Sequence, residues 1–244
     1  MRYVQRALRT LPSYALLTLC AAALLFPLYV TIVNSLHPIA EFLTNPPPSL
    51  WPSHPQWKNY VSGGGAVADT PLPRYLLNSF VTASAITAGQ LITSALAAYA
   101  FAFLRFPGRG LLFAAFLATG FGTFLLRQAF LTIPRELKDA AEMDGYGHLR
   151  FLVFVAAPLA RGALATLAVF AFLQAWNQYL WPLLVTNDPD MRTVQIGIAA
   201  ETKNLDKINV AFAGTVVAFL PMLLLVVAFQ RSLVRGLFGG AVKG

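Results

Sequence analysis

Acidic and basic side chains gather in one short segment, ELKDAAEMDGYGHLR, at residues 136–150. The segment holds four of the chain's ten acidic residues, although long apolar runs lie on both sides of it. Carboxylates in such a cluster could act as acid and base in an enzyme, or they could dock a partner protein. The remainder of the sequence must decide between these uses.

Motifs for catalysis, metal binding and nucleotide binding are missing. The histidines His37, His54 and His148 fall in separate segments and form no His-Glu-x-x-His spacing. No Gly-rich loop ends in Gly-Lys-Ser/Thr, and no Gly-x-Ser-x-Gly turn occurs. The single Cys20 excludes a disulfide framework. We therefore expect no catalytic residue, no metal ligand and no cofactor bound by this chain.

The charged residues leave long gaps in the sequence. Only 11 % of the residues are charged, against about 25 % in typical globular chains. A membrane-spanning helix needs roughly 17 to 25 apolar residues, and five charge-free intervals approach or exceed that length. The sequence thus predicts an all-α, polytopic transmembrane helical bundle in one domain, residues 1–244. The expected spans are 11–34, 75–104, 110–126, 162–180 and 208–230.

Basic residues flank these spans, and the net charge is +8. Because cytoplasmic flanks are enriched in Lys and Arg, both termini are expected in the cytoplasm of a multi-pass plasma-membrane protein. The bases also favour contact with anionic membrane lipids, and they do not cluster as a nucleic-acid-binding face requires. The segments 35–74 and 186–207 are then extracytoplasmic loops, whereas the segment 134–150 and the tail 231–244 are cytoplasmic.

Polar residues within the spans suggest a route for a solute. The expected span 75–104 carries many small and hydroxyl residues around a central glutamine, which fits either close helix packing or the wall of a polar pathway. A second group of aromatic and amide side chains near residue 178 could bind a pyranose or form an interfacial aromatic belt. The candidate pathway residues are Thr87, Gln90, Ser94, Trp176, Asn177, Gln178 and Tyr179.

No acidic residue lies within a span, so the chain lacks the ionisable group that a proton- or sodium-coupled transporter normally needs. Energy for transport must then come from a partner on the cytoplasmic side. Within the charged segment, Pro134 suits a helix start, and Glu136 and Asp139 suit its positive end. The Ala140–Ala141 pair keeps one side thin, and Gly145 ends the helix. We interpret this as a docking helix shaped to enter a groove.

The segment IPRELKDAAEMDGYGHLRFLVFVAAPLARGAL resembles the EAA loop of bacterial ABC-importer permeases, with Asp139 in place of the usual Glu. The stretches NYV, YAFAFLRFPGRG, FLQAWNQYLWPLL and GAVKG resemble the MalG-type carbohydrate-importer permeases, including amino-sugar or disaccharide importers of the Usp kind. This resemblance implies a type I importer permease with six spans. It also implies that a coupling helix seats in an ATPase subunit through Glu136, Asp139, Ala140, Ala141, Asp144 and Gly145.

The resemblance further implies the partners. They are a homologous second permease subunit, two ATPase subunits that hold ATP and Mg, and an extracytoplasmic sugar-binding protein above segment 186–207. The tail residues 239–244 would also reach the ATPases. Alternatives are a membrane-embedded glycosyl or lipid transferase, a permease for a non-sugar solute such as glycerol phosphate, a passive channel, and a charged segment that only anchors a loop at the membrane surface.

The span count conflicts with the placement of both termini. Five spans put the termini on opposite sides, whereas the basic flanks place both inside. The run 110–126 is long enough to cross once and too short to cross and return. We therefore expect that one helix and a loop, roughly 30 residues, are missing near residues 118–120. A chain break or an impossible Cα–Cα distance should then appear between about Leu112 and Gly122.

Overall fold

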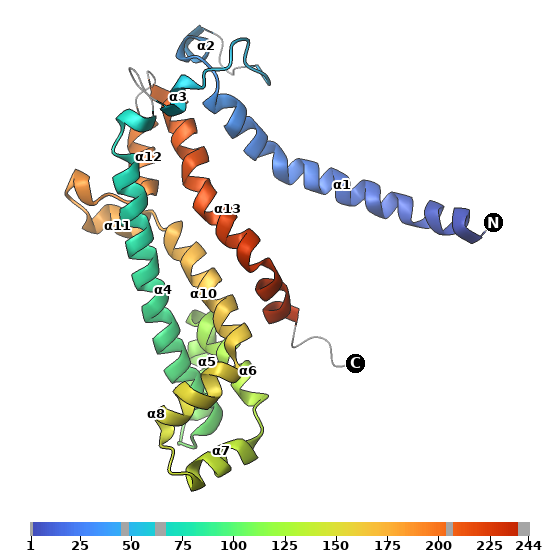
Figure 1. Ribbon diagram of the computed structural model, residues 1–244, viewed down its shortest axis with the longest axis vertical. Coiled ribbons are helices and arrows are strands. Elements are labelled where there is room, and N and C mark those ends of the chain that lie inside the picture. Colours follow the sequence, from blue (N-terminus) through green and yellow to red (C-terminus); the bar gives the residue numbers. More distant parts are fainter. Residues whose placement is uncertain (1, 45–48, 62–66, 204–206, 239–244) are drawn as a thin grey trace. The chain divides into compact units, whose positions relative to one another are not determined.

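The computed structural model describes residues 2–44, 49–61, 67–203 and 207–238, and its regular elements over those ranges are all helical (Figure 1). The chain forms two compact units. The first comprises residues 1–76 and 182–220, and the second comprises residues 77–181 and 221–244. Helices α4 (Leu72–Phe103) and α13 (Ile208–Phe238) each run from one unit into the other. The all-α prediction is confirmed for the described residues.

Among the described residues, three helices are long and apolar enough to cross a membrane: Pro12–Ser35 within α1 (Arg2–Ser35), all of α4, and Ile208–Gln230 within α13. These match three of the predicted spans to within three residues. The fourth predicted span corresponds to α10 (Arg161–Trp176). It ends four residues earlier than expected, where the Asn177 side chain donates a hydrogen bond to the Leu173 carbonyl oxygen at 2.8 Å.

The predicted span 110–126 is wrong. The chain instead forms two helices of 11 residues, α5 (Arg109–Thr119) and α6 (Phe121–Leu131), which meet at Gly120. Each is about 16 Å long at ~1.5 Å per residue, roughly half of a ~30 Å hydrocarbon core. The Arg127 guanidinium of α6 lies 4.1 Å from the centre of the Phe113 ring of α5. The two helices therefore fold back on each other as a short hairpin.

The expected chain break is also absent, because the chain continues without interruption through residues 112–122. Gly120 is required at the reversal, since an added Cβ would lie 2.8 Å from the carbonyl oxygen of Phe116. Charge spacing could not reveal this turn. Arg109 and Arg127 bracket the apolar run in the same way whether it crosses a membrane or returns.

The second unit has a core built around the C-terminal half of α4. Figure 1 shows α5, α6 and α8 (His148–Phe151) gathered beside that half of the helix. The fully buried side chains of Leu126 and Phe130 pack there with Phe151 and Leu167. Full burial of each such side chain stabilises the fold by about 1.5–3 kcal/mol. An added Cβ at Gly122 would lie 2.6 Å from the Ser94 hydroxyl and 2.9 Å from Leu167, so α4, α6 and α10 approach closely there.

The first unit contains several short helices. They are α2 (Ile39–Thr44), α3 (Lys58–Val61), η1 (Val67–Asp69), η3 (Pro189–Met191) and α12 (Val194–Glu201), while α11 (Leu180–Val185) leads into the unit. The Pro-rich segment 35–74, predicted as a loop, contains the short helices α2, α3 and η1. Pro38 lies directly before α2 and does not interrupt it.

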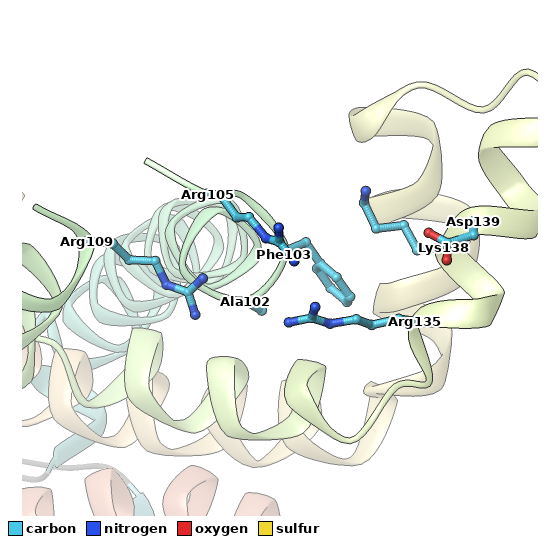
Figure 2. Close-up of a pocket in the computed structure, with 7 residues that line it drawn as sticks. All are labelled: Ala102, Phe103, Arg105, Arg109, Arg135, Lys138 and Asp139. Atoms are coloured by element: carbon cyan, nitrogen blue, oxygen red, sulfur yellow. The ribbon is translucent and has the colours of Figure 1, made fainter. Parts of the chain in front are cut away.

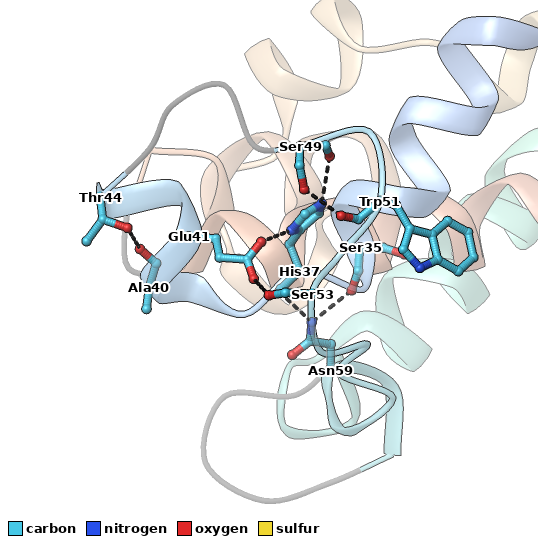
Figure 3. Close-up of polar contacts among 9 residues, drawn as sticks. All are labelled: Ser35, His37, Ala40, Glu41, Thr44, Ser49, Trp51, Ser53 and Asn59. Atoms are coloured by element: carbon cyan, nitrogen blue, oxygen red, sulfur yellow. Dashed lines mark hydrogen bonds and ion pairs between the residues drawn. The ribbon is translucent and has the colours of Figure 1, made fainter.

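A buried histidine fastens the segment that follows α1. His37 is fully buried, and its Nδ1 contacts the Glu41 carboxylate while its Nε2 lies 3.0 Å from the Ser49 carbonyl oxygen (Figure 3). Ser53 donates to the other Glu41 oxygen. The hydrogen bond from Ser53, followed by the contact with His37, holds the pKa of Glu41 below its ordinary value of 4.5. Together these bonds tie α2 to the loop after it.

Asn59, from the quoted stretch NYV, connects three parts of the first unit. Its amide donates to the carbonyl oxygens of Ser35 at 2.8 Å and His37 at 3.2 Å, and its oxygen accepts from Asn209 of α13 at 3.1 Å. Elsewhere in this unit, an added Cβ at Gly197 would lie 2.1 Å from the Tyr75 ring. Only glycine therefore lets α12 approach α4 here.

Candidate coupling site and solute pathway

The charged segment forms helix α7 (Arg135–Met143), a helix of nine residues. Pro134 is its N-cap, with φ −56° and ψ 140°, so it stands one position before the first helical residue. The Pro134 carbonyl accepts the first hydrogen bond, from the Leu137 amide at 3.3 Å. Glu136 and Asp139 lie in the first turns, where the helix dipole favours a carboxylate.

The end of α7 is a Schellman motif, which confirms Gly145 as the residue that stops the helix. Gly145 has φ +78°, in the left-handed region. Its amide donates to the Glu142 carbonyl at 3.0 Å, and the next amide, of Tyr146, donates to the Ala141 carbonyl at 2.8 Å. The last carbonyls of the helix are thereby satisfied, and the chain turns sharply back toward α8.

The two alanines of α7 face in different directions. Ala141 is buried in the core of the second unit, whereas Ala140 is exposed. The reason is helical periodicity, since consecutive residues lie about 100° apart around the axis. The expectation that both alanines form a thin outer side is therefore wrong for Ala141, which packs against its own chain.

The exposed side of α7 forms a stripe that we call the docking stripe: Glu136, Asp139, Ala140 and Met143. These residues lie at i, i+3, i+4 and i+7, so they share one helix face. Met143 is 89 % exposed, the most exposed large apolar side chain described in the chain. Sequence reasoning missed it because one methionine among charges carries no periodic signal. Asp144 is exposed beyond the end of the stripe.

Side-chain contacts hold α7 in place. Lys138 pairs with Glu142 at 2.5 Å, and this hydrogen bond and the lysine charge keep the pKa of Glu142 below 4.5. The Arg150 guanidinium lies 4.4 Å from the centre of the Tyr146 ring. The Tyr99 hydroxyl of α4 lies 2.9 Å from Nδ1 of His148 in α8. The turn after α7 is thus tied to α8, and α8 is tied to α4, while Ala141 packs α7 against the core of the second unit.

A bent segment joins α7 to α10. It comprises α8, a π-helical segment η2 (Leu152–Ala156) and α9 (Ala157–Leu159), and it meets α10 at an angle of 86°. The break falls at Ala160, beside Pro158 and Arg161.

The three pathway candidates of α4 do not share one environment. Thr87 and Ser94 are buried inside the second unit, and the Thr87 hydroxyl donates to the Ala83 carbonyl at 2.7 Å. Gln90 is exposed. Of the three, only Gln90 presents its side chain outward from this chain.

The candidates after α10 divide in a similar way. Trp176 is 2 % exposed and stacks on Phe172, with ring centres 5.7 Å apart. Its indole N–H has no hydrogen-bond partner among the described residues. Asn177, Gln178 and Tyr179 are exposed. Within the described residues, no group of three or more His, Cys, Asp or Glu side chains could hold a metal ion.

Comparison with known proteins places this geometry in a family. Residues 2–239 match the family described as "Binding-protein-dependent transport system inner membrane component". The sn-glycerol-3-phosphate transport system permease protein UgpE of Brucella abortus is 34 % identical and covers 96 % of this chain and 97 % of its own length. UgpE of Pectobacterium atrosepticum is 35 % identical over 92 % of this chain and 94 % of its own.

A solved structure shares the fold. It is described as a bacterial ABC transporter involved in the import of the acidic polysaccharide alginate, and one of its chains matches with a TM-score of 0.74. That match has 20 % sequence identity and covers 92 % of this chain and 96 % of the other.

The relatives are longer than this chain. The Brucella abortus alignment spans 275 positions, whereas 96 % of 244 residues is about 234, so about 40 residues of the relative have no counterpart here. The transferase and channel alternatives have no support among these matches. The chain belongs to the family of binding-protein-dependent transport system inner membrane components, and it is a permease subunit of an ABC importer rather than an enzyme.

Proposed function

We propose that α7 is the coupling helix of this permease, and that its docking stripe seats in a cleft of a cytoplasmic ATPase subunit that holds ATP and Mg. The observation that supports this is the arrangement of the stripe. Two carboxylates and an exposed methionine surround the small side chain of Ala140. A partner can approach the helix closely at Ala140, enclose Met143, and pair with Glu136 and Asp139.

Coupling in this proposal depends on rigid attachment. Closure of two ATPase subunits moves α7, and two contacts pass that movement to the spans, one between the turn after α7 and α8 and one between α8 and α4. Tyr146, Arg150 and the Tyr99–His148 pair form this connection. Residues 239–244, expected to touch the ATPases as well, lie outside the described residues, and α13 continues as a helix to Phe238.

The full assembly that we propose contains a homologous second permease, two ATPase subunits and an extracytoplasmic binding protein. Helix α1 supports the need for more than this chain. Only 6 % of the best apolar window in Pro12–Ser35 is buried, and Leu24 is 78 % exposed. An apolar helix of this length requires lipid or another subunit around it.

The proposed solute is a carbohydrate delivered by the binding protein. The support is the resemblance of FLQAWNQYLWPLL to sugar permeases, together with the exposed Asn177, Gln178 and Tyr179 after α10. A second candidate is a glycerol phosphate, because the UgpE relatives named above carry that solute in their description and are 34–35 % identical. Both are small polyhydroxylated molecules.

The hairpin of α5 and α6 supports the proposed placement of both termini in the cytoplasm. A half-length hairpin that enters and leaves on one side adds no crossing. The remaining spans, α1, α4, α10 and α13, are four, which is an even number, so both basic termini can lie inside. The loss of about 40 residues relative to the relatives would then have replaced two spans with two half-length helices.

Uptake by the reconstituted complex tests the proposal. The permease pair, its ATPases and its binding protein are placed in liposomes, and labelled disaccharide, amino sugar and sn-glycerol 3-phosphate are supplied separately. We expect ATP-dependent uptake of one of them. Transport of none, from a complex whose binding protein holds one of these ligands, would contradict the proposal. Equal uptake without ATP would contradict the coupling.

A further inference from the structure

We propose that a basic pocket beside α7 binds the phosphate head group of an anionic phospholipid of the cytoplasmic leaflet. The pocket has a volume of about 270 Å³ and is lined by Ala102, Phe103, Arg105, Arg109, Arg135, Lys138 and Asp139. This inference goes beyond the proposed transport function, which does not require it. It concerns a site that the docking stripe does not use, apart from Asp139 at its edge.

Three guanidinium groups from different elements converge on this pocket. Arg105 follows α4, Arg109 begins α5 and Arg135 begins α7, and Figure 2 shows the three groups turned toward the same space. Within the described residues, no carboxylate lies within 4.0 Å of any of them. Lys138 is already paired with Glu142. Three guanidinium groups therefore share the pocket with one carboxylate, Asp139, which leaves an excess of positive charge.

The general enrichment of bases on the cytoplasmic side explains the sign of these charges, not their convergence. Arg105 and Arg135 are 30 residues apart in sequence. Arg109 donates to the Leu104 carbonyl oxygen at 3.1 Å, which fixes its side chain beside the pocket. Guanidinium groups arranged around one space bind the oxygens of a phosphate with several charge-assisted hydrogen bonds.

Position and lining favour a lipid as the source of the phosphate. The apolar span of α4 ends at Phe103, so the pocket lies at the boundary where lipid phosphates are found. Ala102 and Phe103 form an apolar wall on one side of the pocket. Leu111 of α5, two residues after Arg109, is 80 % exposed. A pocket of this size lies just below the roughly 300–1,000 Å³ typical of small-molecule sites. The pocket therefore suits the phosphate head group of a lipid better than a whole small-molecule ligand.

The test is competition between phosphatidylglycerol and phosphatidylcholine for the full-length chain in its complex, read by native mass spectrometry. We expect phosphatidylglycerol to be preferred by about tenfold or more. The preference should disappear in Arg105→Gln/Arg135→Gln. It should persist in Arg105→Lys/Arg135→Lys, which keeps both charges, and in the control Arg161→Gln, which removes a base outside the pocket.

Three results would overturn the inference. The first is an equal affinity of the wild type for the two lipids, or an unchanged preference in Arg105→Gln/Arg135→Gln. The second is binding of inorganic phosphate or sn-glycerol 3-phosphate in this pocket without any preference for the anionic lipid, which would assign it to a soluble anion. The third is loss of the ATPase subunits from Arg105→Gln/Arg135→Gln with lipid preference intact, which would assign it to the partner protein.

Discussion

Replacing Gly145 by alanine should loosen the end of the coupling helix without any steric clash. An added Cβ at Gly145 has no atom within 4 Å, so the cost arises from its φ of +78° alone. A left-handed residue with a Cβ costs about 1–2 kcal/mol. That free energy corresponds to a factor of about 5–30 in the equilibrium between the closed and the open Schellman turn.

Hydrogen exchange of the full complex measures this factor. The reporters are the amides of Gly145 and Tyr146, which donate to Glu142 and Ala141. We expect protection of the Tyr146 amide to fall about fivefold to thirtyfold in Gly145→Ala. More ATP should also be hydrolysed per solute transported, because a loosened α7 transmits less of its motion.

Gly147→Ala is the matched control. It adds the same Cβ two residues away, where the backbone is extended (φ −78°, ψ 171°) and the space is also open. In Gly147→Ala, the hydrogen exchange of the Tyr146 amide should change by less than about twofold. Equal loss of protection in the two variants, or no loss in Gly145→Ala, would refute the assignment of a left-handed turn as the stop of α7.

Three further changes test the packing and the electrostatics. Gly122→Ala should lower the stability of the second unit by about 1–3 kcal/mol, because its Cβ overpacks a close helix contact; thermal unfolding in detergent measures this. Gly197→Ala should destabilise the first unit by a similar amount, and Tyr75→Leu should restore part of the loss in the double variant, by the same measurement. The pKa of Glu142 is lowered, so its carboxyl group should titrate below pH 4.5. Its ion pair with Lys138 should therefore stabilise α7 above pH 4.5, and this contribution should be lost as the pH falls through the lowered pKa. Carbodiimide labelling at several pH values measures the titration midpoint.

Controls for the two glycine changes lie in the neighbouring long helices. Gly89→Ala in α4 and Gly162→Ala in α10 meet no atom within 4 Å, and Gly214→Ala in α13 meets its nearest atom at 3.6 Å. Unfolding temperatures of Gly122→Ala or Gly197→Ala equal to these controls would contradict the packing. A Glu142 midpoint at or above 4.5, or no rise of that midpoint in Lys138→Gln, would contradict the ion pair.

Composition predicted the long helices well, because the physical demand is simple. A run of about 20 apolar residues without charge has few alternatives to a span, and α1, α4 and α13 follow the charge gaps closely. The same reasoning failed for residues 110–126. Their composition suits a span, but the reversal depends on the backbone of Gly120, with φ −125° and ψ 65°. Hydropathy contains no information on such a turn.

The candidate site was predicted in outline and not in detail. The stop at Gly145 followed from its residue type, because only glycine adopts a left-handed turn without strain. The direction of Ala141 did not follow, since it depends on which side of α7 packs against the core around Phe130 and Phe151. The pocket of Arg105 and Arg135 was likewise hidden, because it forms only when α4 and α7 come together.

The most direct test of the coupling proposal is site-specific photocrosslinking from Met143. A benzoylphenylalanine at this highly exposed position should form a covalent adduct with the ATPase subunit in the intact complex, and the yield should change when ATP is added. The same probe at Trp57, which is 67 % exposed in the first unit, should give no ATPase adduct. No adduct from position 143 in a complex that still transports its solute would contradict the account.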